Sequence, residues 1–164
     1  QVTLRHVLQE HGRQCARLGW IDFHTGLGPS GVGERIFACR DDAAALVRAK
    51  AWWGERITSI YDGSSTSALL TGLMWTVAYE ECAQAEYTGI ALEYGTVPVM
   101  EVLDALRADQ WLENHPEAGA AQREAIKQRM LAAFYTDTDA WKQAVLAQGI
   151  EAARQAVAGL ARGG

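Results

Sequence analysis

The sequence has little that would direct the chain to a membrane, to nucleic acid or to an oxidising compartment. No apolar run approaches the roughly 20 residues of a membrane span, and no signal peptide is visible. No long basic stretch offsets the net charge of −5, which argues against nucleic acid and anionic membranes as main partners. The three cysteines are widely spaced and form no CxxC pair, which favours a reducing cytoplasm.

The chain also lacks a starting methionine. Gln1 begins directly in what the residue pattern predicts to be a helix, so we expect a fragment of a longer protein whose missing elements lie upstream. Its 164 residues fit one domain, or a large part of one, and 49% hydrophobic residues are enough for a core.

Two common catalytic signatures fail or are absent. Gly26, Gly28 and Gly31 satisfy GxGxxG, but Pro29 and the further glycines spoil the helix that would hold a pyrophosphate, and no Walker lysine follows any glycine cluster. The GxSxG elbow of serine hydrolases does not occur. The sequence therefore gives no support to a dinucleotide site or a serine nucleophile.

What is present is an alternation of strand and helix patterns, typical of an α/β sandwich with a mostly parallel sheet. The helical C-terminal third would pack on a face of that sheet. The segments that we predict are a helix over 4–18, a strand over 20–24, a glycine-rich loop over 25–33, a strand over 35–39, a helix over 41–54 that Asp41 caps, a strand over 57–60, a weakly indicated helix over 69–77, a strand over 88–96 and a helix capped by Thr96 that ends at Asn114, with two further helices after it.

The first candidate for chemistry is the segment IDFHTG. Residues two apart on a strand share a face, so Asp22 and His24 point the same way. His24 ends the strand, where open α/β sheets hold their ligands. A neutral imidazole there can bind zinc, with Asp22 orienting it as a neighbouring carboxylate. The plainer interpretation is that His24 makes a local hydrogen bond and closes the strand.

Glu93 is the second candidate. It lies in the apolar run IALEYG, where an unpaired carboxylate is costly. A glutamate at a strand end beside a metal is suited to act as a general base on bound water. The structural alternative is a buried glutamate paired with Arg35 or Arg40.

The two motifs together resemble a known family. DFHTGLGP, followed by LEYGT, resembles the zinc carboxypeptidase superfamily, and within it a bacterial branch of carboxypeptidase-like proteins of unknown function related to the succinylglutamate desuccinylase and aspartoacylase group. The resemblance runs from about Leu4 to the helices beyond Pro98. It implies that His24 is a zinc ligand and Glu93 the general base. It also implies that residues 1–164 are the C-terminal part of a three-layer αβα catalytic domain.

The resemblance has one gap. The superfamily's His-x-x-Glu zinc pair does not occur in this sequence, and its substrate-clamping Asn and Arg positions have no match either. We expect these elements upstream of Gln1. The fragment alone is therefore expected to be inactive.

The function implied by the resemblance is zinc-dependent hydrolysis of an amide next to a free carboxylate. The substrate would be a peptide C-terminus or an N-acyl amino acid, and Thr25, Gly26, Tyr61 and Tyr94 are the residues that we expect along its cleft. The alternative is a binding or assembly module that keeps the fold without the metal site. Missing partner strands would leave an exposed sheet edge, so we expect association into homo-oligomers.

Overall fold

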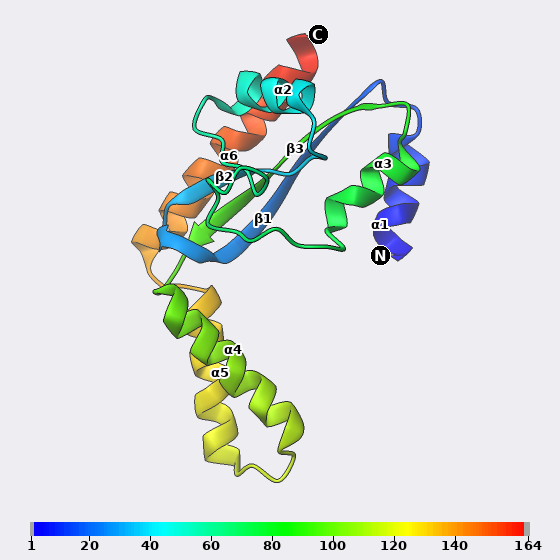
Figure 1. Ribbon diagram of the computed structural model, residues 1–164. Coiled ribbons are helices and arrows are strands. Elements are labelled where there is room, and N and C mark those ends of the chain that lie inside the picture. Colours follow the sequence, from blue (N-terminus) through cyan, green and yellow to red (C-terminus); the bar gives the residue numbers. More distant parts are fainter. Residues whose placement is uncertain (1, 163–164) are drawn as a thin grey trace. The chain divides into compact units, whose positions relative to one another are not determined.

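The computed structural model describes residues 2–162 and shows a mixed α/β protein, which confirms the predicted class (Figure 1). A π-helical turn follows the first helix, and a 3-10 turn precedes the third. None of the described helices is long and apolar enough to cross a membrane. In chain order the elements are α1 (Val2–Val7), the π-helical turn (Leu8–Gly12), β1 (Arg17–Ser30), β2 (Gly33–Phe37), α2 (Ala43–Trp53), the 3-10 turn (Met74–Thr76), α3 (Val77–Glu81), β3 (Glu86–Gly95), α4 (Val99–Asn114), α5 (Ala120–Phe134) and α6 (Asp139–Arg162).

The described sheet has three strands in the order β1-β3-β2. The backbone N–H of Glu86, at the start of β3, donates to the carbonyl of Ala16, just before β1, at 2.8 Å. After β1, the N–H of Gly31 donates to the carbonyl of Gly95, the last residue of β3, at 3.0 Å. Because the two starts pair with each other and the two ends do the same, β1 and β3 run parallel.

The pairing of β2 with β3 has the opposite sense. The N–H of Ala38, just after β2, donates to Gly89 in the first half of β3, whereas Gly95 at its end donates to Val32, just before β2. These bonds make β2 antiparallel to β3. The described sheet is therefore mixed, and the finer prediction of a mostly parallel sheet inside a three-layer sandwich stays a prediction.

β1 is longer than the sequence indicates. The prediction ends this strand at His24 and makes a loop of the glycines, but β1 continues through Gly26 and Gly28 to Ser30. Both glycines have positive φ, 127° and 90°, which side chains rarely allow. The loop prediction was wrong because the glycines bend a strand that stays paired with β3 instead of ending it.

The first helix, in contrast, is shorter than predicted. α1 ends at Val7 and the π-helical turn at Gly12, well before residue 18. A Cβ added to Gly12 would lie 2.5 Å from the Cys82 sulfur, so this backbone lies directly against the end of α3. The apolar residues keep helical spacing up to residue 18, but the contact of Gly12 with Cys82 coincides with the end of the helical structure.

Three smaller predictions were also wrong. Instead of a strand over 57–60, Thr58 forms an isolated parallel bridge with Ile36. No helix begins before Met74 in the stretch 69–77, where Gly72 has a φ of 73°. The N-cap of α2 is Asp42, not Asp41: its Oδ1 accepts the N–H of Ala44 at 3.0 Å.

The described residues form two compact units. Unit 1 comprises residues 2–23, 34–92 and 149–162, and unit 2 comprises residues 24–33 and 93–148. That these residues belong to a single domain stays a prediction.

Unit 1 holds a large apolar core. β3 is buried on both of its faces, as its continuous apolar run predicts: Tyr87 on one face is 4% exposed, and Ile90 on the other is 0% exposed. Phe37 from β2 and Trp53 from α2 are buried with them. The indole N–H of Trp53 donates to the carbonyl of Ala152 at 3.0 Å, which attaches α2 to α6.

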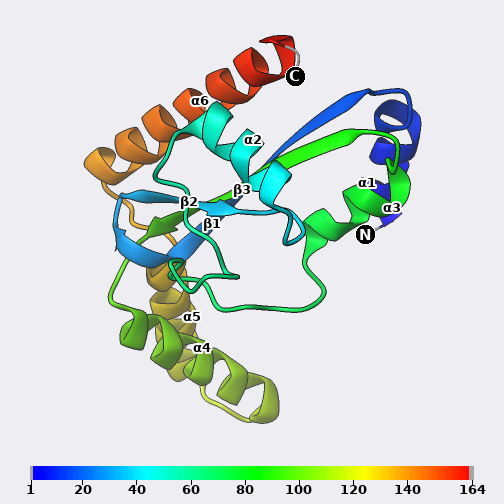
Figure 2. The same cartoon turned by 45° about the horizontal axis from the view of Figure 1, so that its top comes forward.

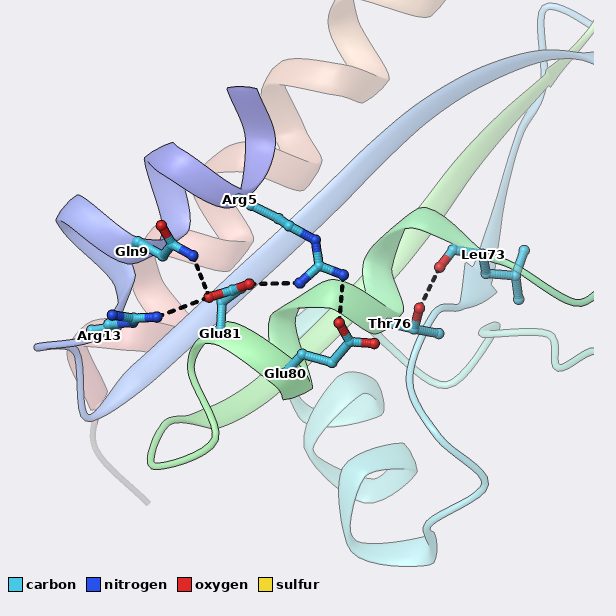
Figure 3. A network of polar contacts seen from close by, with 7 residues as sticks. All are labelled: Arg5, Gln9, Arg13, Leu73, Thr76, Glu80 and Glu81. Carbon is cyan, nitrogen blue, oxygen red and sulfur yellow. Dashed lines mark hydrogen bonds and ion pairs between the residues drawn. The ribbon is translucent and has the colours of Figure 1, made fainter. Parts of the chain in front are cut away.

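A network of charged side chains joins α1 and its π-helical turn to α3 (Figure 3). Arg5 donates to Glu81 at 2.6 Å and to Glu80 at 2.5 Å. Gln9 and Arg13 also donate to Glu81, at 2.9 and 3.1 Å. These donors hold the pKa of the Glu81 carboxyl below its ordinary value, with Gln9 and Arg5 contributing most.

In unit 2, α4 and α5 lie side by side as a helical hairpin (Figures 1 and 2). The prediction that Thr96 caps α4 was wrong, because Pro98 occupies the N-cap position. The Thr96 hydroxyl instead donates to the carbonyl of Ala133 at 2.5 Å. Trp141 donates to the carbonyl of Gly95 at 2.9 Å. The end of β3 is thus tied to α5 and α6.

Candidate functional site

The two residues that carry the sequence hypothesis, His24 and Glu93, come together in unit 2. His24 Nδ1 lies 3.9 Å from Glu93 Oε2, although the residues are 69 positions apart. β1 and β3 are neighbours in the sheet, which explains why two strand residues so distant in sequence meet.

The burial of the pair is asymmetric. The Glu93 side chain is 9% exposed and that of His24 is 51% exposed. Over the whole residue, Glu93 is the only aspartate, glutamate, lysine or arginine among residues 2–162 that is buried, at 7% exposure. The Glu81 side chain is also 9% exposed, but it is paired with Arg5 and Arg13. Because burying a carboxylate costs free energy unless polar groups compensate, the position of Glu93 calls for an explanation beyond packing.

One compensating group comes from the bent part of β1. The N–H of Leu27 donates to Glu93 Oε1 at 3.2 Å. Leu27 lies between the two positive-φ glycines, Gly26 and Gly28, so the unusual backbone of this segment is where the strand presents an amide to the carboxylate. The glycines that the sequence analysis assigned to a loop are therefore part of the site.

Glu93 also faces a cavity of about 240 Å³ within unit 2. Thr25, Gly26 and Leu27 line it from β1. The remaining lining is apolar and comes from α4 and α5: Val99, Val102, Leu103, Leu106 and Phe134. The sequence predicts a helix here but gives no sign that its apolar face lines a cavity beside Glu93.

The other predicted site residues are divided between the two units, and three of their hydroxyl groups donate to backbone carbonyls. The Thr25 hydroxyl donates to the carbonyl of Phe134 at 2.7 Å, and Tyr94, which is 1% exposed, donates to Val145 at 3.1 Å. Asp22 and Tyr61 belong to unit 1, where the Tyr61 hydroxyl donates to the carbonyl of Cys39 at 2.9 Å. Their predicted roles in orienting His24 and lining the substrate cleft stay predictions.

The arginines suggested as partners for Glu93 have contacts of their own in unit 1. Arg35 lies 3.3 Å from Glu151, and the Arg40 guanidinium lies 4.3 Å from the ring centre of Tyr79. Burial raises the pKa of the Tyr79 phenol to about 12, so that ring stays neutral under the cation.

The residues of the described segment do not make a complete zinc site. A catalytic zinc needs three protein ligands and an open position. Nowhere in residues 2–162 do three His, Cys, Asp or Glu side chains gather as a metal-binding group. His24 and Glu93 are one imidazole and one carboxylate, which is a partial donor set.

The fold and this pair define a mixed α/β protein with a histidine–glutamate site at the edge of an apolar cavity. The chain belongs to the family described as "Protein of unknown function (DUF2817)", which matches it over residues 1–148. No match was found among curated proteins or among solved structures.

Proposed function

We propose that this chain carries the general base and one metal ligand of a zinc-dependent, carboxypeptidase-like hydrolase. The reaction is cleavage of an amide next to a free carboxylate, in a peptide C-terminus or an N-acyl amino acid. The observation that carries the proposal is the 3.9 Å approach of His24 Nδ1 to Glu93 Oε2, with the same carboxylate lining a cavity.

In this proposal Glu93 moves the proton. The Leu27 amide fixes its Oε1, and Oε2 is the oxygen nearer His24. A carboxylate held in this way can take a proton from an attacking water and pass it to the leaving amine. The low exposure of Glu93 keeps bulk water from competing for that proton.

His24 supplies the metal ligand, because its imidazole ring is half exposed and lies beside the Glu93 carboxylate. Zinc, when bound, supplies polarisation of the scissile carbonyl and a more acidic water. Since the described residues provide only a partial donor set, the proposal requires further ligands from outside residues 2–162. Asp22 is proposed to orient His24, and Thr25, Gly26, Tyr61 and Tyr94 to border the substrate cleft.

The wider setting belongs to the same proposal. We propose that the chain is the C-terminal part of a three-layer αβα sandwich with a mostly parallel sheet, related to the zinc carboxypeptidases. It would act in the cytoplasm as a homo-oligomer, on small substrates and not on nucleic acid or membranes.

One observation favours a second candidate. Because no group of three metal-binding side chains occurs within residues 2–162, the fold also fits a binding or assembly module without catalytic metal. Such a module would keep the cavity but hydrolyse nothing.

The test uses the complete gene product, with zinc content, melting temperature and hydrolysis of N-acyl amino acids and short peptides as measurements. Glu93→Gln should keep fold and zinc but lose turnover by about a hundredfold to ten-thousandfold. His24→Ala should lose zinc and activity together. Glu101→Gln is the matched control, an exposed glutamate on α4, and should change nothing.

Two results would count against the proposal. A folded, zinc-loaded Glu93→Gln protein with wild-type turnover would remove Glu93 as the base. A wild-type protein without zinc and without hydrolysis of any substrate would favour the binding module.

A further inference from the structure

The cavity beside Glu93 has a chemical character that points to one part of its ligand. α4 contributes Val99, Val102, Leu103 and Leu106, which recur at i, i+3, i+4 and i+7 and so form one stripe along the helix. Phe134, the last residue of α5, closes the apolar side.

The apolar face of a helix is normally buried against a neighbouring element, but most of this stripe is partly exposed to solvent. Val102 is 4% exposed, whereas Val99, Leu103 and Leu106 are 50%, 38% and 40% exposed. Clustered apolar side chains that stay in contact with water are typical of binding surfaces. Here they surround a hollow that is also lined by the buried Glu93 carboxylate.

The walls of the cavity are held in place by the strands. A Cβ added to Gly26 would lie 2.8 Å from Phe134 Cε1, so only glycine lets the ring lie against β1. The Thr25 hydroxyl holds the carbonyl of Phe134, and the Thr96 hydroxyl holds that of Ala133. The end of α5 is thus fixed by two hydrogen bonds, and the cavity is formed before any ligand binds.

The charge of the cavity lining and the volume of the cavity further limit the kind of group that it can bind. Glu93 is the only ionisable residue in the lining, so the cavity offers no cation to a ligand carboxylate. Its volume of about 240 Å³ is below the roughly 300–1,000 Å³ of pockets that enclose a whole drug-sized ligand. It therefore suits one uncharged group of the substrate and not the whole molecule.

We infer that this cavity selects substrates with an apolar group, such as a medium-length acyl chain or an aromatic side chain, next to the scissile amide. The inference rests on the proposed function for the chemistry at Glu93. It adds the class of substrate: the apolar group lies against α4 and Phe134, and the amide lies at the Glu93 carboxylate.

The experiment compares two substrate series in the zinc-supplemented complete gene product. One series varies the acyl group of N-acyl alanine from acetyl to hexanoyl, with succinyl as the charged member. The other keeps acetyl and varies the amino acid from alanine to phenylalanine. In one of the series kcat/KM should rise by about 10- to 100-fold from the small to the apolar member.

Three variants locate the preference. Leu103→Ser should reduce this ratio about tenfold, because it replaces apolar lining with a hydroxyl. Leu103→Lys should reduce it further and improve the succinyl substrate, because it places a cation at the cavity. Leu131→Ser is the matched control: Leu131 is 63% exposed on α5 and does not line the cavity, so the ratio should not change.

Binding is measured separately by calorimetry with Glu93→Gln protein and the hexanoyl, acetyl and phenylalanine compounds. If the protein hydrolyses amides but shows no apolar preference in either series, the inference fails while the proposed function stands. If nothing is hydrolysed but an apolar compound binds more tightly than its small counterpart, and Leu103→Ser removes the difference, the apolar selectivity of the cavity stands. The proposed function then fails, and with it the placement of a scissile amide at Glu93. Equal binding of all compounds without hydrolysis overturns both.

Discussion

The two units use their apolar and polar residues differently. In unit 1, Phe37, Trp53, Ile90 and Leu92 are almost fully buried, and the Glu81 side chain, which is 9% exposed, is paired with Arg5 and Arg13. Unit 2 buries fewer large side chains completely, and there α4 keeps apolar residues partly exposed around a buried carboxylate. In unit 1 a carboxylate of low exposure is thus paired with cations, whereas in unit 2 the buried carboxylate of Glu93 lines an apolar cavity.

The arrangement in unit 2 is informative because both of its parts cost stability. A buried carboxylate and water-exposed leucines are arrangements that folding alone would not favour. Where both occur at one cavity, a functional role is the simplest reason for them. The comparison predicts that unit 1 is where substitutions affect folding most strongly, and that unit 2 is where they affect the site.

The largest expected effect comes from comparing two tryptophans. Trp53→Ala removes a side chain that is 1% exposed in the core of unit 1, and should cost about 3–5 kcal/mol of unfolding free energy. Trp111 on α4 in unit 2 is 38% exposed and stacks on His115, so Trp111→Ala should cost about 1 kcal/mol or less. Urea titrations followed by circular dichroism measure both, and equal losses would refute the contrast between the units.

The next effect compares two buried glycines of β3. A Cβ on Gly95, in unit 2, would lie 2.1 Å from the carbonyl oxygen of Gly28 and 2.2 Å from that of Pro29, so backbone must move. On Gly89, in unit 1, the nearest atom is the Tyr87 hydroxyl oxygen at 2.5 Å, with the carbonyl of Ala38 at 3.1 Å.

Gly95→Ala should therefore destabilise by about 3 kcal/mol, and Gly89→Ala by about 1 kcal/mol. Gly95→Ala should also impair the site, because the backbone that it displaces follows Leu27, whose amide holds Glu93. Chemical denaturation and turnover are the measurements. Equal stability of the Gly95→Ala and Gly89→Ala proteins would contradict the prediction, because it would show that the backbone of Gly28 and Pro29 moves at little cost.

The smallest effect concerns pH. The pKa of Glu81 is lowered chiefly by Gln9 and Arg5, and that of Asp137 in unit 2 by Lys142. A carboxyl whose pKa is lower in the folded state contributes stability that is present above its unfolded pKa and is lost as the pH falls through the folded value. The window for Glu81 therefore lies below its ordinary pKa of 4.5.

Glu81→Gln should flatten the fall in melting temperature as the pH is lowered through this window. Asp137→Asn should flatten it less, because Asp137 has one cationic partner and Glu81 has several donors. Calorimetric melting at a series of pH values measures both. A larger change for Asp137→Asn would contradict the view that the networked carboxylate of unit 1 matters more.

Much of the fold was predictable where a local pattern agrees with tertiary packing. The apolar run closed by Gly95 predicts β3, and Asp42 lies one residue from the predicted cap of α2. Predictions failed where long-range contact decides the conformation. The glycines of β1 stay in a strand because that strand remains paired with β3, and the first helix stops where Gly12 meets Cys82.

For the site, the sequence by itself determined which residues deserve chemical attention. A histidine after a short apolar run and a glutamate inside another are unusual enough to be noticed without a structure, because polar groups in such runs are costly. The family membership over residues 1–148 is also a property of the sequence alone.

Only the tertiary structure decided that these residues meet, and what surrounds them. The approach of His24 to Glu93 depends on the pairing of β1 with β3, and the Leu27 amide reaches the carboxylate because two glycines bend the strand. The apolar face of α4 has the same periodicity whether it packs in a core or lines a cavity. Periodicity records which residues share a face, whereas the distance to the next element decides whether that face is filled or open.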